Sequence, residues 1–316
     1  MKKLFVFVLA LCLMLGFTCV SAQDDSYQVG ILQLVQHPAL DLATQGFRDA
    51  LVEKLGNKVT FDEQNASGDS SNCAIIANSL VTAGMDLIMA NATPALLACS
   101  NATGDIPVLG TSITNYESAM DIELTENGAT GFNVSGTSDL APLDGQADMI
   151  HELFPEAKTV GLLYCNSEAN SIFQIKGIEG YLQEMGYETK RYGFNDSNDL
   201  AAVVQNATEC DVIYIPTDNT AANNTEAIAN VVIPAGVPVI AGEEGICAGC
   251  GVATLTISYY DIGYQTGVMA YEILAEGADV SEMAIAYAPK FTKKYNPVNA
   301  QQLGITIPED YEAIED

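Results

Sequence analysis

The chain has 316 residues, 48% of them hydrophobic, and its 12 basic and 41 acidic residues give a formal net charge of −29. This length and composition predict one large or two medium folded domains with a full hydrophobic core, and argue against extensive disorder. A surface this acidic repels phosphate groups, which disfavours nucleic acids and anionic membrane surfaces as partners.

The first 22 residues have the features of a secretory signal peptide. Lys2 and Lys3 precede an apolar stretch at 4–17, and Val20-Ser21-Ala22 fits the small-x-small pattern of a cleavage site. Two alternatives remain open: a lipid anchor at Cys19, although the three residues before it fit that motif poorly, and an uncleaved membrane anchor. No second apolar stretch is long enough to span a bilayer. We expect an exported protein, periplasmic or at the cell surface, with tethering undecided.

Six cysteines follow the signal segment, and an even number in an exported protein suggests disulfides. They are Cys73, Cys99, Cys165, Cys210, Cys247 and Cys250. Cys247 and Cys250 form a close pair, for which a local disulfide and two buried thiols are both open. A zinc site needs more ligands than the two histidines of the chain, His37 and His151, can add. We therefore expect no metal and no cofactor.

The remaining chain repeats one plan of strands and helices. Val29–Gln33 resembles Val160–Tyr164, and Ile106–Gly110 resembles Val237–Ala241 at the same separation. Apolar runs typical of strands lie at 28–35, 58–61, 86–90 and 106–111 in the first half, and at 159–164, 187–192, 211–215 and 237–241 in the second.

Stretches with helical spacing separate these runs. One apolar helix face is formed by Leu40, Ala43, Phe47, Ala50, Leu51 and Leu55, and Gly56-Asn57 marks its end. A late strand at Thr254 runs into another long helix. Strands alternating with helices predict an α/β fold of two similar lobes, each a parallel sheet flanked by helices.

Polar residues follow the strands at equivalent places in both halves. They occur at 36–41, 91–95 and 111–114, and again at 165–171, 216–220 and 242–245. Open α/β sheets bind ligands at the carboxyl ends of their strands, where helix N-termini also present free N–H groups. If the lobes face each other, these six loops line one cleft. Taken singly, Thr93, Ser167 and Asn170 are also explained as helix caps.

Several of these stretches together resemble a known family. They are VGILQLVQHPALDLATQGFRDAL, NATPA, TSIT, NSEANS and YIPTDNT. The chain is similar along nearly its whole mature length to the exported substrate-binding proteins of ABC importers, of the tryptophan/tyrosine-binding type. The resemblance implies the type I periplasmic-binding fold, in which two lobes joined by a multi-crossing hinge close on a ligand. It also implies an aromatic amino acid as ligand, ABC permease subunits as membrane partners, and a monomer.

The lobe boundaries rest on this resemblance, with residues 27–133 plus 258–282 in lobe 1 and 134–257 plus 283–316 in lobe 2. Two features depart from the family pattern. Gln36 precedes His37-Pro38 where members often carry an acid, and the loop GEEGICAGCGVA is unusual. The ligand can therefore differ from tryptophan or tyrosine.

An amino acid needs donors for its carboxylate, acceptors for its ammonium group and an apolar wall for its side chain. The predicted donors are Thr93, Ser112, Thr114, Ser167 and the N–H groups near Asn170. Asp218 is the first choice of acceptor, followed by Glu243 or Glu244. The predicted wall comprises His37, Tyr116 and Tyr164, and Gln33 and Asn219 complete the predicted site.

Three alternatives remain. An enzyme is disfavoured, because no nucleophile elbow is present and two histidines leave little acid–base machinery. A sensor subunit that signals to a membrane receptor has the same fold. The same cleft could also bind a branched amino acid, a nucleoside or a sugar.

Overall fold

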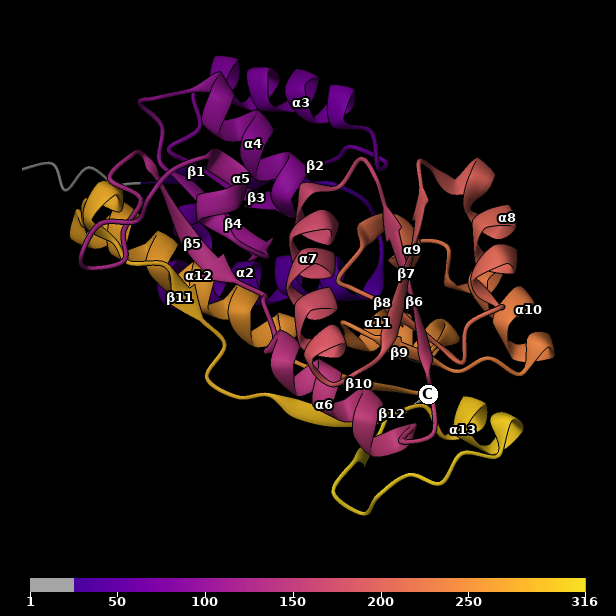
Figure 1. Cartoon of the computed structure of the whole chain (residues 1–316). Coiled ribbons are helices and arrows are strands. Elements are labelled where there is room, and N and C mark those ends of the chain that lie inside the picture. Colours follow the sequence, from indigo (N-terminus) through magenta and orange to yellow (C-terminus); the bar gives the residue numbers. More distant parts are fainter. Residues whose placement is uncertain (1–25, 316) are drawn as a thin grey trace, which may run out of the picture.

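The computed structural model describes residues 26–315, so the predicted signal peptide lies outside the described residues. The chain folds into two α/β lobes that lie side by side, each with a mainly parallel sheet between helices (Figure 1). The predicted fold class is therefore confirmed.

The sheet of the first lobe has the order β11-β5-β4-β3-β1-β2, and its neighbouring strands are all parallel. Its strands are β1 (Tyr27–Gln33), β2 (Val59–Asn65), β3 (Leu87–Asn91), β4 (Val108–Ile113), β5 (Val134–Ser138) and β11 (Ala286–Tyr287). Its helices are α2 (Pro38–Leu55), η1 (Gly56–Lys58), α3 (Ser70–Ala83), α4 (Thr93–Ala102), α5 (Tyr116–Met120), α12 (Tyr259–Glu276) and η2 (Val280–Glu282).

The sheet of the second lobe has the order β13-β12-β10-β9-β8-β6-β7, and only the β10–β12 pair is antiparallel among its described strands. Its strands are β6 (Thr159–Cys165), β7 (Glu188–Phe194), β8 (Val212–Ile215), β9 (Val239–Ala241), β10 (Ala253–Thr256), β12 (Thr292–Tyr295) and β13 (Glu312–Ala313). Its helices are α6 (Leu143–Leu153), α7 (Ala169–Glu184), α8 (Ser197–Ala207), α9 (Asn219–Ala222), α10 (Thr225–Ala235), α11 (Glu244–Cys250) and α13 (Pro297–Leu303).

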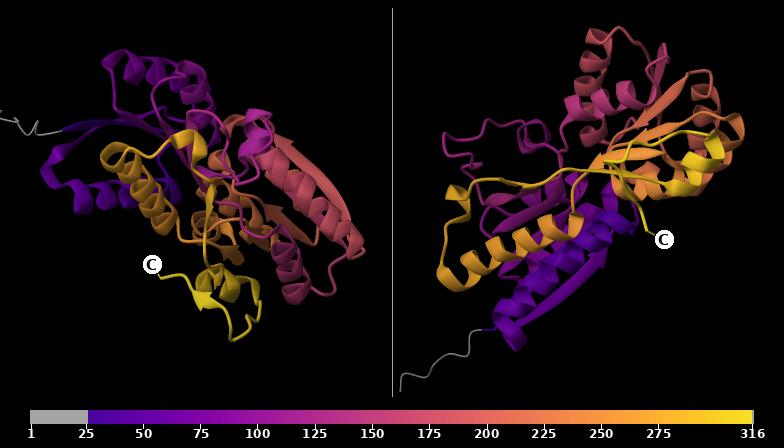
Figure 2. Two further views of the ribbon diagram at one scale, coloured as in Figure 1. Left: turned by 90° about the vertical axis from the view of Figure 1, so that its left-hand side faces the viewer. Right: turned by 90° about the horizontal axis from the view of Figure 1, so that it is seen from below.

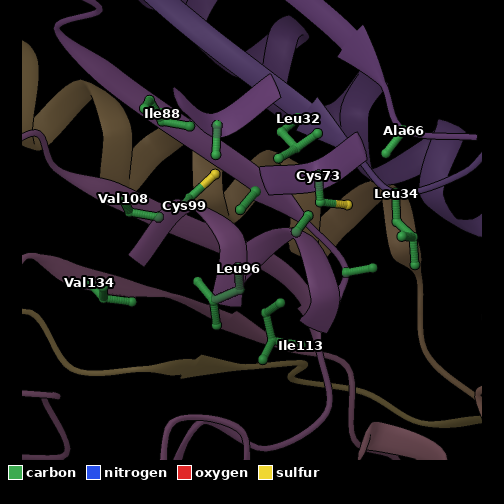
Figure 3. Close-up of a cluster of buried hydrophobic side chains, with 14 of the residues drawn as sticks. Leu32, Leu34, Ala66, Cys73, Ile88, Leu96, Cys99, Val108, Ile113 and Val134 are labelled. Carbon is green, nitrogen blue, oxygen red and sulfur yellow. The ribbon is translucent and has the colours of Figure 1, made fainter. Parts of the chain in front are cut away.

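The strands are buried on both faces, which explains their nearly uninterrupted apolar sequences. In the first lobe, Leu32 and Ile88 pack with α3 and α4 on one face, in the cluster drawn in Figure 3. Val29 and Met89 pack on the other face with α2 and α12. The second lobe is built the same way, with α8, α10 and α11 over one face and α6 and α7 over the other.

The chain crosses between the lobes at 139–142, 257–258 and 288–291. The last crossing is the yellow segment that runs from one lobe to the other in Figure 2. The expected lobe boundaries need one correction. β5 and β11 pair in the first sheet, so residues 134–138 and 286–287 belong to lobe 1 rather than lobe 2.

Helices α2 and α12 lie side by side under the first sheet (Figure 2) and approach each other through glycines. A Cβ atom at Gly263 would overlap the carbonyl oxygen of Ala43, and one at Gly46 would overlap that of Tyr260. The backbones therefore touch, with no space for side chains between them. Because α2 begins directly after His37 and α12 begins at Tyr259, this contact fixes two side chains relative to each other.

The six cysteines in the described part of the chain are free thiols. Cys247 and Cys250 are buried in α11, where burial raises the pKa of both thiols. The disulfide considered for this pair is therefore absent. Among residues 26–315, no helix has both the length and the apolar character needed to cross a membrane, and no cluster of side chains is suited to hold a metal ion.

Candidate functional site

A small cavity lies between the two lobes at the carboxyl ends of their strands. The first lobe contributes His37, Ser112, Thr114 and Tyr259, and the hinge contributes Asp139. The second lobe contributes Asn170, Thr217, Asp218, Asn219, Ala222 and Glu243. Both lobes and the hinge therefore meet at one place, as the convergence of the strand ends predicts.

Two larger depressions adjoin this cavity. One follows the cleft between the lobes, from Val35 and Pro94 on one side to Glu168 and Asn219 on the other. The second is a groove of about 1260 Å³ between the start of α2 and helix α11, and it shares Ala222, Glu243 and Tyr259 with the cavity. Residues that line the polar cavity thus also line a groove whose walls include Leu42 and Ile257.

The backbone is strained at two strand ends near the site. Ala92, just before α4, has φ 86°, and Ser112 has φ 56°. Ser112 lies within an irregularity of the β4–β5 pairing, where the register shifts between Gly110 and Ile113. Positive φ values and bulges in non-glycine residues are enriched at binding sites, because they redirect a side chain at some energetic expense.

Unsatisfied polar atoms concentrate in this cavity. Seven buried side-chain nitrogen or oxygen atoms of the described residues have no hydrogen-bond partner, and five of these belong to cavity residues. The five are His37 Nδ1, Ser112 Oγ, Asp139 Oδ1, Asn170 Oδ1 and Thr217 Oγ1. Leaving such a group unpaired costs about 1–3 kcal/mol, so native proteins rarely do so without a ligand or water to satisfy it.

Glu168 organises the second-lobe side of the site. This buried carboxylate accepts hydrogen bonds from the backbone N–H groups of Asn219 (3.0 Å) and Thr220 (2.9 Å). It also accepts from the side chains of Asn219 (2.7 Å), Thr220 (2.8 Å) and Asn170 (3.0 Å). Glu168 therefore holds the start of the short helix α9 against α7, and its role is to position the side chains that line the cavity.

Three buried carboxyl groups line the cavity, and no lysine or arginine of the described residues does. Burial raises the pKa of Asp139 to about 6, although the hydroxyls of Tyr259 and Thr114 act in the opposite direction. Burial raises the pKa of Glu243 to about 7. Burial and the charge of Glu168 raise the pKa of Asp218 as well. A cationic group in the cavity would stabilise the ionised form of all three.

Seven of the predicted site residues line the cavity. They are His37, Ser112, Thr114, Asn170, Asp218, Asn219 and Glu243. The other five, Gln33, Thr93, Tyr116, Ser167 and Glu244, do not.

Two of these five form hydrogen bonds within the first lobe. The Tyr116 hydroxyl is buried and donates to the carbonyl oxygens of Gly110 and Thr137, both at 3.1 Å, so it is a core residue and not a wall of the site. Gln33 donates to Asp41 (2.7 Å) and accepts from Thr44 (2.6 Å), away from the cavity. Sequence spacing could not show this, because it does not reveal the direction of a side chain at a strand end.

The remaining three lie at other positions. Thr93 is buried at the start of α4 without reaching the cavity. Ser167 is exposed in the cleft, and its hydroxyl lies 3.0 Å from Cys165 Sγ. Glu244 lines the outer groove and forms an ion pair with Lys294 at 2.7 Å. The half-buried Tyr164, the third expected wall residue, packs with the core of the second lobe.

The sequence analysis missed Asp139, Thr217, Ala222 and Tyr259 as cavity residues. Thr217 lies in the loop PTDNT, which the sequence analysis places at the site, so this residue could have been predicted from the sequence. Asp139 follows β5, whose sequence VSGTS is completely buried but lacks an apolar run. Periodicity therefore gave no sign that a strand of the first sheet ends at Asp139.

The known proteins that match the chain agree with this geometry. The family model of ABC transporter substrate-binding proteins matches residues 28–314. A tyrosine-binding protein of Clostridioides difficile (strain R20291) is 35% identical over 261 residues, which are 81% of this chain and 75% of that protein.

Two solved structures show the fold and the arrangement of the lobes. An ABC domain from Streptococcus pneumonia in complex with L-Trp is 32% identical to this chain. The match covers 92% of this chain and 100% of that domain, with a TM-score of 0.87. The ligand-free, open structure of a substrate-binding protein with adhesive properties from Clostridium difficile is 33% identical. The match covers 92% of this chain and 99% of that chain, but the TM-score is 0.70. At nearly equal identity, the lobes of this chain are therefore arranged more like those of the L-Trp complex.

The fold is the type I periplasmic-binding fold that the sequence predicts, with the cavity where such folds close on a ligand. The chain belongs to the family of ABC transporter substrate-binding proteins.

Proposed function

We propose that this protein is the extracytoplasmic binding component of an ABC importer and that it binds an aromatic amino acid in the cavity between its lobes. The observation that carries the proposal is the group of five unpaired buried polar atoms in one interlobe cavity. Relatives described as tyrosine-binding or crystallised with L-Trp support the choice of an aromatic amino acid.

The surroundings of the cavity suit the two ends of such a ligand. Carboxyl groups and hydroxyls line the cavity itself, where an amino acid would place its charged groups. Ala222 and Tyr259 belong both to the cavity and to the adjoining groove, whose walls include Ile257. An aromatic side chain extending from the cavity would therefore meet apolar surface.

Membership of the family supports delivery of the ligand to a membrane permease. The predicted signal peptide would bring the chain to the outer side of the membrane. Membrane partners and a monomeric state are part of this proposal.

Fluorescence titration tests the ligand directly, because the chain contains no tryptophan. L-tryptophan added to the purified mature chain, and excited where tyrosine absorbs little, should give a saturable one-site change in its own emission. L-tyrosine and L-phenylalanine should compete, and D-tryptophan serves as the stereochemical control. The ligand assignment fails if none of the three L-amino acids gives a saturable signal or raises the unfolding temperature.

A further inference from the structure

We propose that the cavity binds a primary ammonium group through three acceptor atoms, Asp139 Oδ1, His37 Nδ1 and Asn170 Oδ1, and that Asp139 is its counter-ion. The inference rests on the proposed function, since it assigns the amino end of the proposed amino-acid ligand. It also moves the ammonium site from Asp218, the first choice from the sequence, to a residue of the hinge.

Asn170 is oriented with its carbonyl oxygen toward the cavity. Its side-chain nitrogen donates to the carbonyl oxygen of Thr217 and to Glu168, both at 3.0 Å. Turning the amide over would place its oxygen against two acceptors. Asn170 Oδ1 is therefore a committed acceptor, and it is buried without a partner.

His37 presents an unprotonated nitrogen for a related reason. The side-chain nitrogen of Asn219 donates to Glu168 at 2.7 Å, so Asn219 Oδ1 must face His37 Nε2, 3.3 Å away. His37 Nε2 therefore carries the proton and donates it. Burial lowers the pKa of His37, which keeps the ring neutral and leaves a lone pair on Nδ1.

Asp139 has one oxygen in use and one free. Its Oδ2 accepts from the Tyr259 hydroxyl at 3.0 Å, whereas its Oδ1 has no partner with hydrogen-bond geometry, although the Thr114 hydroxyl is near enough to lower the pKa of the carboxyl group. The other two carboxyl groups of the cavity are already used as helix caps. Asp218 accepts from the N–H groups of Cys165 (2.6 Å) and Ala221 (2.9 Å) and from the Ser171 hydroxyl (2.8 Å).

Glu243 is used in the same way, because it accepts from the N–H groups of Gly245 and Ile246 at the start of α11. Asp218 and Glu243 add negative potential to the cavity, but their geometry is explained without a ligand. Asp139 Oδ1 is the one cavity carboxylate oxygen among the described residues that lacks any partner.

Three acceptors with one formal negative charge match a primary ammonium group, which has three N–H donors and one positive charge. A water molecule has only two donors and cannot satisfy all three. His37 comes from the first lobe, Asp139 from the hinge and Asn170 from the second lobe. An ammonium group that contacts all three would hold the closed arrangement together.

Isothermal titration calorimetry of the mature chain tests the assignment with two ligands. L-tryptophan has the ammonium group, and indole-3-propionate is the same molecule without it. The wild-type protein should prefer L-tryptophan, binding it at least about 100-fold more tightly than indole-3-propionate. The loss of one partner from a buried charge pair commonly weakens binding by that factor. Asp139→Asn, which keeps the shape but removes the charge, should reduce this preference at least tenfold by weakening L-tryptophan alone.

Asp105→Asn is the matched control, because it removes the same charge from an exposed loop residue and should leave the preference unchanged. His37→Phe, which removes a neutral acceptor on another element, should reduce the preference by a smaller factor and guards against a folding defect of the first variant. Circular dichroism checks that each variant is folded.

The outcomes separate this inference from the proposed function. If the wild-type protein binds no aromatic amino acid, the proposed function fails and the inference falls with it. If it binds L-tryptophan but folded Asp139→Asn and His37→Phe keep the full preference, the ammonium group lies elsewhere and only the inference is overturned.

Discussion

The residues of the polar run that follows β6, from Asn166 to Ser171, have different roles. Glu168 and Ser171 hold the backbone and side chains of the loop after β8, through α9 and Asp218 respectively. Asn170 is the member that lines the cavity. A capped helix and a binding site are therefore not alternatives here, because the capping network gives the cavity side chains their orientation.

The His37 tautomer can be measured by NMR. We expect the imidazole to be neutral with the proton on Nε2 at pH 7, because burial lowers its pKa from the usual value near 6.5 and Asn219 fixes the donor. Nitrogen-15 shifts of a histidine-labelled sample distinguish the two ring nitrogens. The chain has two histidines, so His37→Gln assigns the signals. A proton found on Nδ1, or a protonated ring at pH 7, would contradict the acceptor role.

The contact between α2 and α12 determines where His37 and Tyr259 lie. Gly263→Ala should destabilise the protein by about 1–3 kcal/mol, because the new methyl group overlaps the backbone of α2 and the helices must separate. Chemical denaturation measures the change in the free energy of unfolding.

Gly180→Ala is the matched control for this substitution. Gly180 is exposed within α7, and a Cβ atom there has no atom within 4 Å. This change should stabilise the protein by about 0.5–1 kcal/mol, since alanine favours helix more than glycine does. Equal effects of the two substitutions would show that the α2–α12 contact can relax and does not constrain the site.

At the level of elements, apolar runs and the repeat predict the strands well. The predicted runs at 28–35 and 159–164 correspond to β1 and β6, and the helix expected from Leu40 to Leu55 corresponds to α2. β5 escaped prediction because its buried residues are small and polar, and its place beside β4 comes from tertiary pairing. The omission of Asp139, which directly follows β5, has this cause.

Within the site, the sequence identifies the loops better than the side chains that act. Most of the cavity residues follow strands or begin helices, where parallel sheets bind ligands. Which residue of a loop faces the cavity depends on hydrogen bonds between distant segments, such as those that orient Asn170 and Asn219. No local pattern contains that information.

For the whole molecule, the ionisation of the cavity is linked to closure. In the closed form, burial raises the pKa of Asp139 to about 6 and of Glu243 to about 7, and it raises that of Asp218 too. Opening would hydrate the cavity and bring these pKa values closer to the usual value of about 4. The closed form therefore binds more protons between about pH 4 and pH 8, and a fall in pH through this range favours closure.

Small-angle X-ray scattering should detect this linkage. Without ligand at pH 8, Asp139 and Glu243 are ionised and repel each other, so the lobes should separate. L-tryptophan at pH 8 should reduce the radius of gyration, because its ammonium group supplies the missing positive charge. Lowering the pH to 5 without ligand should cause part of the same reduction. His37 opposes this effect, since its pKa is lowered in the closed form, but it is one group against three acids.

Asp105→Asn should respond like the wild type, whereas Asp139→Asn should already be more compact at pH 8 without ligand. A radius of gyration that depends on neither ligand nor pH would mean that closure is independent of charge in the cavity.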